Sequence, residues 1–492
     1  MIPALVALPA MAGALAFLLP WVAARRALLP AAALAHAGLT AAAWRSRPAP
    51  ALGGWLALDA PGLVFLTIAS ALFAAAALYA PGYLRREGTG SRRDFEEGAF
   101  FADAPERVFI GCLLLFLAAM TLVTVSQHMG LLWVAVEGTT LASAPLIYFH
   151  RHHRSLEATW KYLLLCSVGI ALALLGTFFL AVAVSRPEGG DTPLVLADLV
   201  EAARAGADPA WLRVAVVFLI VGYGTKTGLA PLHTWLPDAH SESPSLVSAL
   251  LSGALLNCAF LGILRTLQVA SAGGAGGFTA GLLVGFGLAS MIVAAGLILG
   301  QADYKRLLAY SSIEHMGIVS LGIGLGGAAG FGAMLHAVNH SLAKASMFLV
   351  AGNILARFRT KSTAEVRGVL GAMPVSGALW VAGFLALTGM PPFGPFLSEM
   401  LILKGAFDAG RPWVAAGYAA LLALVFIGMS AVVLRMAQPG EDGAQEGFLR
   451  EEASTVLPSL ALMGIVLLLG LFVPAALGET LQAAARAVGH AP

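Results

Sequence analysis

Fourteen long apolar runs decide what kind of protein this sequence can form. Each holds about 20 mostly apolar residues, the length that an α-helix needs to cross the hydrocarbon core of a bilayer. The runs are 2–24, 27–45, 60–82, 107–127, 128–149, 158–184, 211–232, 244–270, 276–300, 303–326, 329–356, 372–393, 411–436 and 453–475. They lack the short alternation typical of a membrane β-barrel. The sequence therefore predicts an all-α polytopic membrane protein with about 14 transmembrane helices.

The composition excludes most other classes of protein. Hydrophobic residues make up 59% of the chain and charged residues only 11%, whereas soluble domains carry roughly 25% charged residues. A soluble enzyme, a disordered chain, a secreted disulfide scaffold and a nucleic-acid binder are therefore excluded. The sequence contains no Walker motif, no Rossmann fingerprint and no nucleophile elbow, and we expect no cofactor.

The sequence also gives no reason to expect a metal. The three cysteines lie far apart inside apolar runs, which fits neither a CxxC metal site nor an iron–sulfur set. His150, His152 and His153 cluster beside Arg151 and Arg154. We interpret this group as a basic loop, although a metal site is the alternative.

The basic residues predict how the helices are oriented. Lys and Arg concentrate in the loops after odd-numbered runs, above all in segments 83–106 and 357–367. By the positive-inside rule these loops face the cytoplasm and both termini lie outside.

Two of the helices are predicted to be broken. Helix 7 runs into Gly228-Leu-Ala-Pro231, and helix 12 runs into Gly389-Met-Pro391-Pro392 before a short extra helix near 396–407. Proline breaks or kinks a helix, and interrupted helices at matching positions of two halves point to an ion or substrate path. Incidental kinks are the alternative.

The breaks lie five spans apart, and an odd number of spans reverses topology. We therefore expect two inverted five-helix repeats, helices 4–8 in 107–270 and helices 9–13 in 271–436. Helices 1–3 in 1–106 precede them, and helix 14 in 437–492 follows.

Four charged residues within the apolar runs or beside a predicted break are candidates for the function. Glu137 lies in helix 5, Lys226 just before the break in helix 7, Lys344 in helix 11, and Glu399 after the break in helix 12. A charge at the bilayer centre costs about 2.5–3.5 kcal/mol on insertion scales, so such residues usually face a pathway. The alternatives are a hydrogen bond to a neighbouring helix for Glu137, a snorkelling side chain for Lys226 and an interfacial position for Glu399.

Two histidines extend this series. His336 and His340 precede Lys344 by two turns and one turn, which places all three on one helical face. Packing residues are the alternative.

Several motifs resemble a known family. The run from Lys226 to Asp238 (KTGLAPLHTWLPD), the following SPSLVSAL, Tyr304–Ser312 (YKRLLAYSS) and the Pro391-Pro392 break resemble the proton-translocating antiporter-like subunits. These subunits occur in respiratory complex I, Mrp-type cation/proton antiporters and membrane-bound hydrogenases. The resemblance covers about residues 60–436. GTTLASAPLIYF, LEATWKYLLLCSVGIALALLGT and AYSSIEHMGI look most similar to the F subunit of hydrogenase-4 and formate hydrogenlyase-type complexes.

The resemblance implies roles for individual residues. Glu137 and Lys226 match an ion pair thought to modulate proton affinity, Lys344 and His340 fall in the helix-11 motif, and Glu399 matches the terminal charged residue of helix 12. The relay residues are then Glu137, Lys226, His336, His340, Lys344 and Glu399, and the supporting residues are His233, Asp238, Asn257, Lys305 and His315.

One position departs from the family pattern. Asn257 stands where the family often has lysine or histidine, and Ser252 replaces a common histidine. The central relay then runs through water or from Lys226 to His336 directly, or the chain has lost conduction and is a scaffold.

The implied function is proton translocation through a buried Glu/Lys/His relay in a membrane-bound redox complex. The chain would perform no redox chemistry itself, and its partners would be other membrane subunits, protons (possibly sodium) and lipid, with no nucleic acid. The resemblance implies a bacterial or archaeal inner membrane. A subunit of a cation/proton antiporter or of an inorganic-carbon uptake complex is the alternative.

Overall fold

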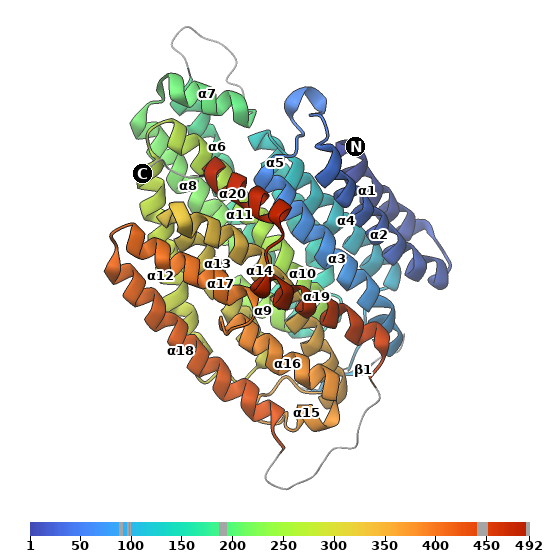
Figure 1. Cartoon of the computed structure of the whole chain (residues 1–492). Coiled ribbons are helices and arrows are strands. Elements are labelled where there is room, and N and C mark those ends of the chain that lie inside the picture. The colour runs from blue at the N-terminus through green and yellow to red at the C-terminus, as the bar shows by residue number, and fades with distance from the viewer. Residues whose placement is uncertain (88–91, 96–97, 99, 186–193, 440–450, 489–492) are drawn as a thin grey trace.

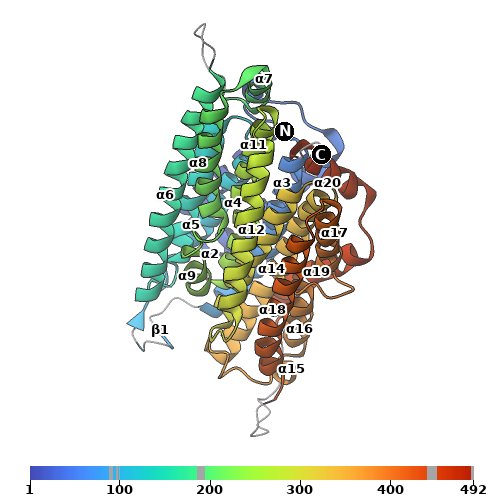
Figure 2. The same cartoon turned by 90° about the vertical axis from the view of Figure 1, so that its left-hand side faces the viewer.

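The computed structural model describes residues 1–87, 92–95, 98, 100–185, 194–439 and 451–488. Parts of the 83–106 segment and of the 437–492 unit lie outside these residues. The described part is a bundle of long helices that run roughly parallel to one another (Figures 1 and 2).

The elements follow one another in four stretches. The first contains α1 (Ile2–Leu18), α2 (Val22–Ser46), the 3₁₀ turn η1 (Leu52–Gly54), α3 (Ala60–Glu87) and the antiparallel strands β1 (Arg92–Arg93) and β2 (Phe100–Phe101). The second contains α4 (Glu106–Val125), α5 (Met129–Ile147), α6 (His153–Val184), α7 (Leu196–Gly206), α8 (Pro209–Thr227), α9 (Trp235–Glu242), α10 (Ser245–Leu250), the π-helical turn η2 (Leu251–Leu255) and α11 (Leu256–Ala272). The third contains α12 (Gly276–Ile298), α13 (Tyr304–Leu325), α14 (Gly327–Phe358), α15 (Val369–Ala372), α16 (Pro374–Leu387), α17 (Gly394–Asp408) and α18 (Pro412–Ala437). The last contains α19 (Ala453–Leu471) and α20 (Ala475–Val488).

Each of the fourteen predicted runs corresponds to helix in the structure. Among the described residues, ten helices are long and apolar enough to cross a membrane, and α1 and α16 are shorter apolar helices. The prediction of an all-α polytopic membrane protein is therefore confirmed. The division into two inverted repeats stays a prediction.

Local signals explain where several of these helices begin. Asp208 caps α8 by accepting hydrogen bonds from the backbone N–H groups of Ala210 and Trp211 (2.8 and 3.1 Å). Asp303 caps α13 in the same way. His128 caps α5, because its Nδ1 accepts from the N–H of Leu131 (3.3 Å). Side-chain caps of this kind satisfy N–H groups that have no partner within the helix.

The two ends of the bundle differ in what they carry. The N- and C-termini and α7 lie at one end, and β1 and α15 lie at the other (Figure 2). The two segments predicted to be basic cytoplasmic anchors contain or adjoin β1 and α15, so the structure places them at the same end. Which end faces the cytoplasm stays a prediction.

Close backbone approach holds α6 against α8. A Cβ added to Gly222 of α8 would lie 2.5 Å from the backbone nitrogen of Ala173 and 2.6 Å from the carbonyl oxygen of Gly169, both on α6. Small residues allow membrane helices to pack this tightly.

We therefore expect Gly222→Ala to lower the midpoint of thermal unfolding of the purified protein. Backbone atoms cannot rotate out of the way, and overpacking costs typically 1–3 kcal/mol. The matched control is Gly285→Ala in α12, where an added Cβ meets nothing within 4 Å. Equal midpoints for the two variants would contradict the packing described above.

An ion pair joins the start of α3 to α11. Arg265 is 1% exposed, and its Nη2 donates to Oδ1 of Asp59 at 2.7 Å while its Nη1 contacts Oδ2. Burial would raise the pKa of the Asp59 carboxyl. The charge and hydrogen bonds of Arg265, with the N–H of Gly62, outweigh burial and bring the pKa below its ordinary value. The pair therefore stabilises the fold in full above about pH 3.9 and less as the pH falls through the lowered pKa.

Asp59→Asn is expected to destabilise the protein at neutral pH by at least about 2 kcal/mol, because it leaves the buried guanidinium without its counter-charge. The thermal unfolding midpoint of the purified variant measures this effect. Asp408→Asn is the control, since Asp408 and Lys404 form an exposed i, i+4 pair (2.5 Å), worth about 0.3–0.5 kcal/mol. A drop for Asp59→Asn no larger than for the control would show that the buried pair contributes little.

Candidate functional site

Lys226 is the last charged residue of α8 and is fully buried. Its Nζ donates hydrogen bonds to Oγ1 of Thr140 on α5 and to the hydroxyl of Tyr162 on α6, each at 2.7 Å. The ammonium also lies 4.5 Å from the centre of the Tyr162 ring. The side chain therefore points into the protein and does not snorkel to the surface.

Glu137 reaches Lys226 through a hydroxyl. Its Oε2 accepts a hydrogen bond from Thr140 Oγ1 at 3.2 Å, and its Oε1 accepts one from Ser167 on α6 at 2.9 Å. Among the described residues, no salt bridge within 4 Å joins Glu137 to Lys226. Instead of the direct ion pair that the resemblance implied, the structure has a bridge in which Thr140 accepts from the lysine and donates to the glutamate.

The break after α8 has a local cause, and other groups of the protein form hydrogen bonds with the backbone groups that the break leaves without helical partners. Gly228 adopts φ +81°, a left-handed conformation that ends the helix and favours glycine. Beyond it, the N–H of Ala230 donates to Ser290 (2.9 Å), and Trp235 donates to the carbonyl of Thr225 (2.8 Å). A backbone break at membrane depth is tolerated only where such partners exist.

Asn257 links the two predicted repeats. Its Nδ2 donates to the carbonyl of Gly253 at 2.8 Å and to Oγ of Ser341 on α14 at 2.6 Å. One turn earlier, Ser252 shares a hydrogen bond with Ser312 of α13 (2.8 Å). Both Gly253 and Ser252 belong to the π-helical turn η2, a distortion that is frequent at functional sites. Buried polar groups therefore continue through the position where the family pattern is lost.

The second predicted repeat holds a buried basic group on α14. Lys344 donates to the carbonyl of Leu308 at 2.7 Å and is fully buried. One turn before it, His340 is also fully buried. Glu314 of α13 is 1% exposed and interacts electrostatically with Lys344.

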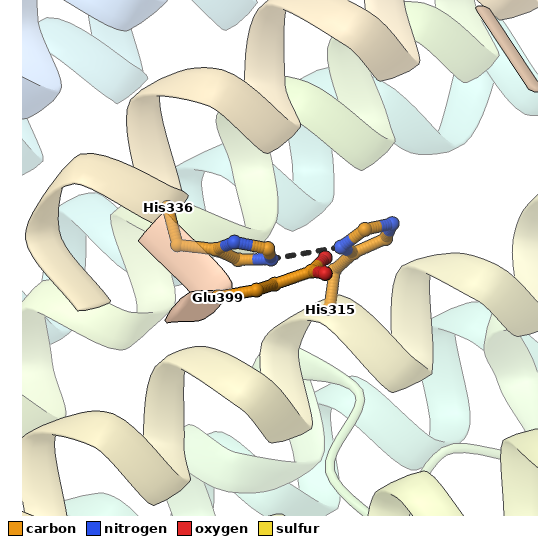
Figure 3. A group of neighbouring side chains, drawn as sticks. All are labelled: His315, His336 and Glu399. Carbon is orange, nitrogen blue, oxygen red and sulfur yellow. Dashed lines mark hydrogen bonds between the residues drawn. The ribbon is translucent and has the colours of Figure 1, made fainter. Parts of the chain in front are cut away.

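Next to this group, His315, His336 and Glu399 point toward one another from α13, α14 and α17 (Figure 3). Nδ1 of His315 and Nε2 of His336 share a hydrogen bond of 2.8 Å. The other nitrogen of His336, Nδ1, bonds Ser398 at 2.9 Å. One donor atom from each of the three residues lies within 4.8 Å of the others. Glu399 is 3% exposed, so it is not an interfacial residue of this chain.

The break in helix 12 makes room for this carboxylate. Gly389 has φ +64°, and a Cβ added there would lie 1.8 Å from Oε2 of Glu399. Only glycine combines that conformation with that approach. Both predicted breaks thus place a charged side chain inside the bundle, Lys226 before the first and Glu399 after the second.

The remaining supporting residues lie around α9. Asp238 accepts hydrogen bonds from Lys161 of α6 (2.9 Å) and Arg306 of α13 (2.6 Å). Lys305 donates to the carbonyl groups of Ser241 and Ser243 (2.9 and 2.6 Å). These contacts fasten the end of α9 to its neighbours.

The fifth supporting residue, His233, lies within the break itself. It is 8% exposed, and its Nδ1 is buried without a partner among the described residues.

Two buried residues were missing from the sequence prediction. Glu314 had a usable signal, because helix 10 is the counterpart of helix 5 in the predicted inverted repeat, and Glu314 is its acid as Glu137 is that of helix 5. His240 of α9 is fully buried, and its Nδ1 bonds the carbonyl of Leu236 at 2.9 Å. His240 had no comparable signal in the sequence.

Relatives of known classification match the chain over most of its length. It is 37% identical over 435 residues to the hydrogenase-4 component F homolog of Methylacidiphilum infernorum, covering 87% of this chain and 88% of the relative. It is 30% identical over 463 residues to NADH-quinone oxidoreductase subunit N of Desulforudis audaxviator, covering 90% and 87%.

The fold and the family agree with these relatives. A chain of respiratory complex I from Thermus thermophilus superposes with a TM-score of 0.81 at 25% identity, covering 99% of this chain and 100% of that one. The family described as NADH:quinone oxidoreductase/Mrp antiporter, transmembrane, matches residues 126–430, which contain the whole Glu137-to-Glu399 series. The chain therefore belongs to the NADH:quinone oxidoreductase/Mrp antiporter family of antiporter-like membrane subunits.

Proposed function

We propose that this chain conducts protons as the hydrogenase-4 component F-type subunit of a membrane-bound redox complex. The observation that carries the proposal is the hydrogen-bonded chain Lys226–Thr140–Glu137. An ammonium donates to a hydroxyl, and the same hydroxyl donates to a carboxylate. A hydroxyl that accepts one hydrogen bond and donates another can pass a proton along. Packing alone would not require this arrangement.

Movement of Glu137 relative to Lys226 is the proposed control step. An opposite charge nearby favours the protonated ammonium, and moving that charge away leaves the lysine desolvated and favours release of its proton. Because Thr140 separates the two charges in this structure, a small shift of α5 against α8 changes their interaction without breaking a direct ion pair.

The second repeat supplies the continuing path. Asn257 and Ser341 connect α11 to α14 beside His340. From there the proposed route runs over Lys344 and the histidine group to Glu399. Histidine suits such a relay, since each ring nitrogen can accept or donate.

The exposure of Glu137 supports a neighbouring membrane subunit. Glu137 is only half-buried, and Ser167, its hydrogen-bond partner, is exposed, as are the apolar side chains Val134 and Leu164 on the same two helices. A carboxylate facing lipid is expensive. We therefore infer that another subunit covers this face of α5 and α6, and that its movement couples redox chemistry elsewhere to Glu137.

The proposed location is the cytoplasmic membrane of a bacterium or archaeon. The end with β1 and α15 faces the cytoplasm and both termini face outward, in line with the positive-inside rule.

The complex isolated through a tag on this chain tests the proposal. We expect hydrogenase-type redox subunits to co-purify, and electron transfer to acidify the lumen of inside-out vesicles with or without sodium. Mrp-type partners, or a carbonic-anhydrase-like partner, would favour the antiporter or carbon-uptake alternative. Acidification that requires sodium would identify sodium as the coupling ion and overturn the proposed proton relay.

A further inference from the structure

The geometry points to a second property of His315, His336 and Glu399: together they form a binding site for a divalent cation of the zinc class. An ion bound there blocks the proton path. The binding site stands on the structure alone, and the blocking effect rests on the proposed function.

The donor set suits such an ion. Two imidazoles and one carboxylate, with a fourth position left open, form a recurrent set of protein ligands for zinc. The three donor atoms come from separate helices and already lie within 4.8 Å of one another. In a tetrahedral site with bonds of about 2.0–2.2 Å, donor atoms lie about 3.3 Å apart. The 2.8 Å His315–His336 contact needs to open by only about half an ångström to reach that spacing.

The surroundings orient one ligand in the way metal sites require. Nδ1 of His336 is held by Ser398 at 2.9 Å, which leaves Nε2 directed at His315 and Glu399 (Figure 3). Metal-bound histidines almost always have their second nitrogen hydrogen-bonded in this manner, because that bond fixes the tautomer and the ring orientation.

An unsatisfied polar atom supplies an independent indication of a ligand. Oε1 of Glu399, which belongs to the group itself, is buried and has no hydrogen-bond partner among the described residues. Buried polar groups are normally paired, and leaving one unpaired costs free energy. The ring centre of His340 lies 4.7 Å from that of His315, so a further imidazole lies next to the group.

The charges around the site favour a dication. Glu399 interacts electrostatically with Glu314, and the remaining charged neighbour of the histidines is Lys344. A bound dication stabilises the ionised form of the Glu399 carboxylate, so an acid at this position favours a divalent ion.

Occupation of the site would stop the relay for a chemical reason. A metal ion takes the same lone pairs on His336 and Glu399 that a moving proton needs. Protons arriving from Lys344 would then find no acceptor, so zinc is expected to inhibit proton movement without affecting electron transfer.

Binding is tested on the purified full chain, with Co²⁺ as a spectroscopic probe and Zn²⁺ as its competitor. We expect one tightly bound ion per chain, with the visible absorption bands of four-coordinate Co²⁺ that Zn²⁺ abolishes. Loss of an orienting hydrogen bond typically weakens metal binding 10–100-fold. We therefore expect that weakening for Ser398→Ala and at least a hundredfold weakening for His315→Gln.

His150→Gln is the matched control. His150, Glu87 and Asp103 form the other group of potential metal ligands among the described residues, and all three are only half-buried. If the affinity for Co²⁺ falls in His150→Gln but is unchanged in both His315→Gln and Ser398→Ala, the proposed metal site is wrong. Ser398→Ala keeps the test decisive if His315→Gln does not fold.

Inhibition is measured separately, as redox-driven proton movement by the intact complex with increasing Zn²⁺. We expect wild type to be inhibited at concentrations that fill the site and Ser398→Ala to need 10–100-fold more. If Zn²⁺ fills the site without slowing proton movement, the proposed blocking effect is wrong. A wild-type complex that moves no protons would overturn the proposed function, while the binding result would still decide the site.

Discussion

Lys226→Ala is expected to reduce proton conduction by the full chain in liposomes about a hundredfold. Without the buried ammonium, a proton has to cross this part of the bundle with no group to carry it. A charge inside the bilayer costs about 2.5–3.5 kcal/mol, and each 1.36 kcal/mol is tenfold in rate. The measurement is the initial pH change inside liposomes after a potassium diffusion potential is imposed.

The control for this variant is Lys404→Ala. Lys404 lies on α17, and its side chain is exposed and paired with Asp408 one turn away. Its removal should leave conduction unchanged. Equal rates for Lys226→Ala and wild type would remove Lys226 from the path.

Glu399→Gln is expected to cause a loss of similar size. Glutamine has almost the same shape but cannot take up and release a proton, so the path is interrupted at the group beyond the histidines. The fold should persist, because Gly389 accommodates the glutamine as it does the carboxylate. The same liposome measurement records the effect.

Glu157→Gln is the matched control for this acid, since Glu157 is an exposed residue of α6 paired with Lys161 at 2.6 Å. Full conduction in Glu399→Gln would mean that the path leaves the second repeat before α17. Glu314, the buried acid of α13, would then be the next candidate.

The fold was predictable because membrane insertion leaves a strong signal in the sequence. A bilayer admits only long apolar helices, so their number could be read from the runs alone. The two breaks were predictable too, since Gly228 with Pro231, and Gly389 with Pro391, have few other uses within a membrane helix.

Other elements have weaker signals. The helices α7 and α20 lie outside the apolar runs and pack through one face only. The π-helical turn η2 inserts one extra residue into an otherwise regular apolar helix. No residue type marks such a turn in advance, because it arises from packing against neighbouring helices.

The site was predictable as a set of residues more than as a geometry. Charge within an apolar run or beside a predicted break identified Lys226, Lys344 and Glu399 as candidates, and the structure buries all three. The bridge through Thr140 could not be predicted, since a threonine in a membrane helix usually bonds its own backbone.

The contact of His315 with His336 and Glu399 was also hidden. These residues come from three helices, so no ligand spacing along the chain could reveal it. The metal site proposed above therefore differs from the sequence-based expectation of no metal.

The most direct test of the central claim is the number of protons moved per electron transferred by the intact complex, compared between wild type and Lys226→Ala. Both numbers are obtained in the same inside-out vesicles from the initial rates of acidification and electron transfer. If the buried relay of this chain carries protons, the ratio falls in the variant while electron transfer continues. An unchanged ratio would contradict the account.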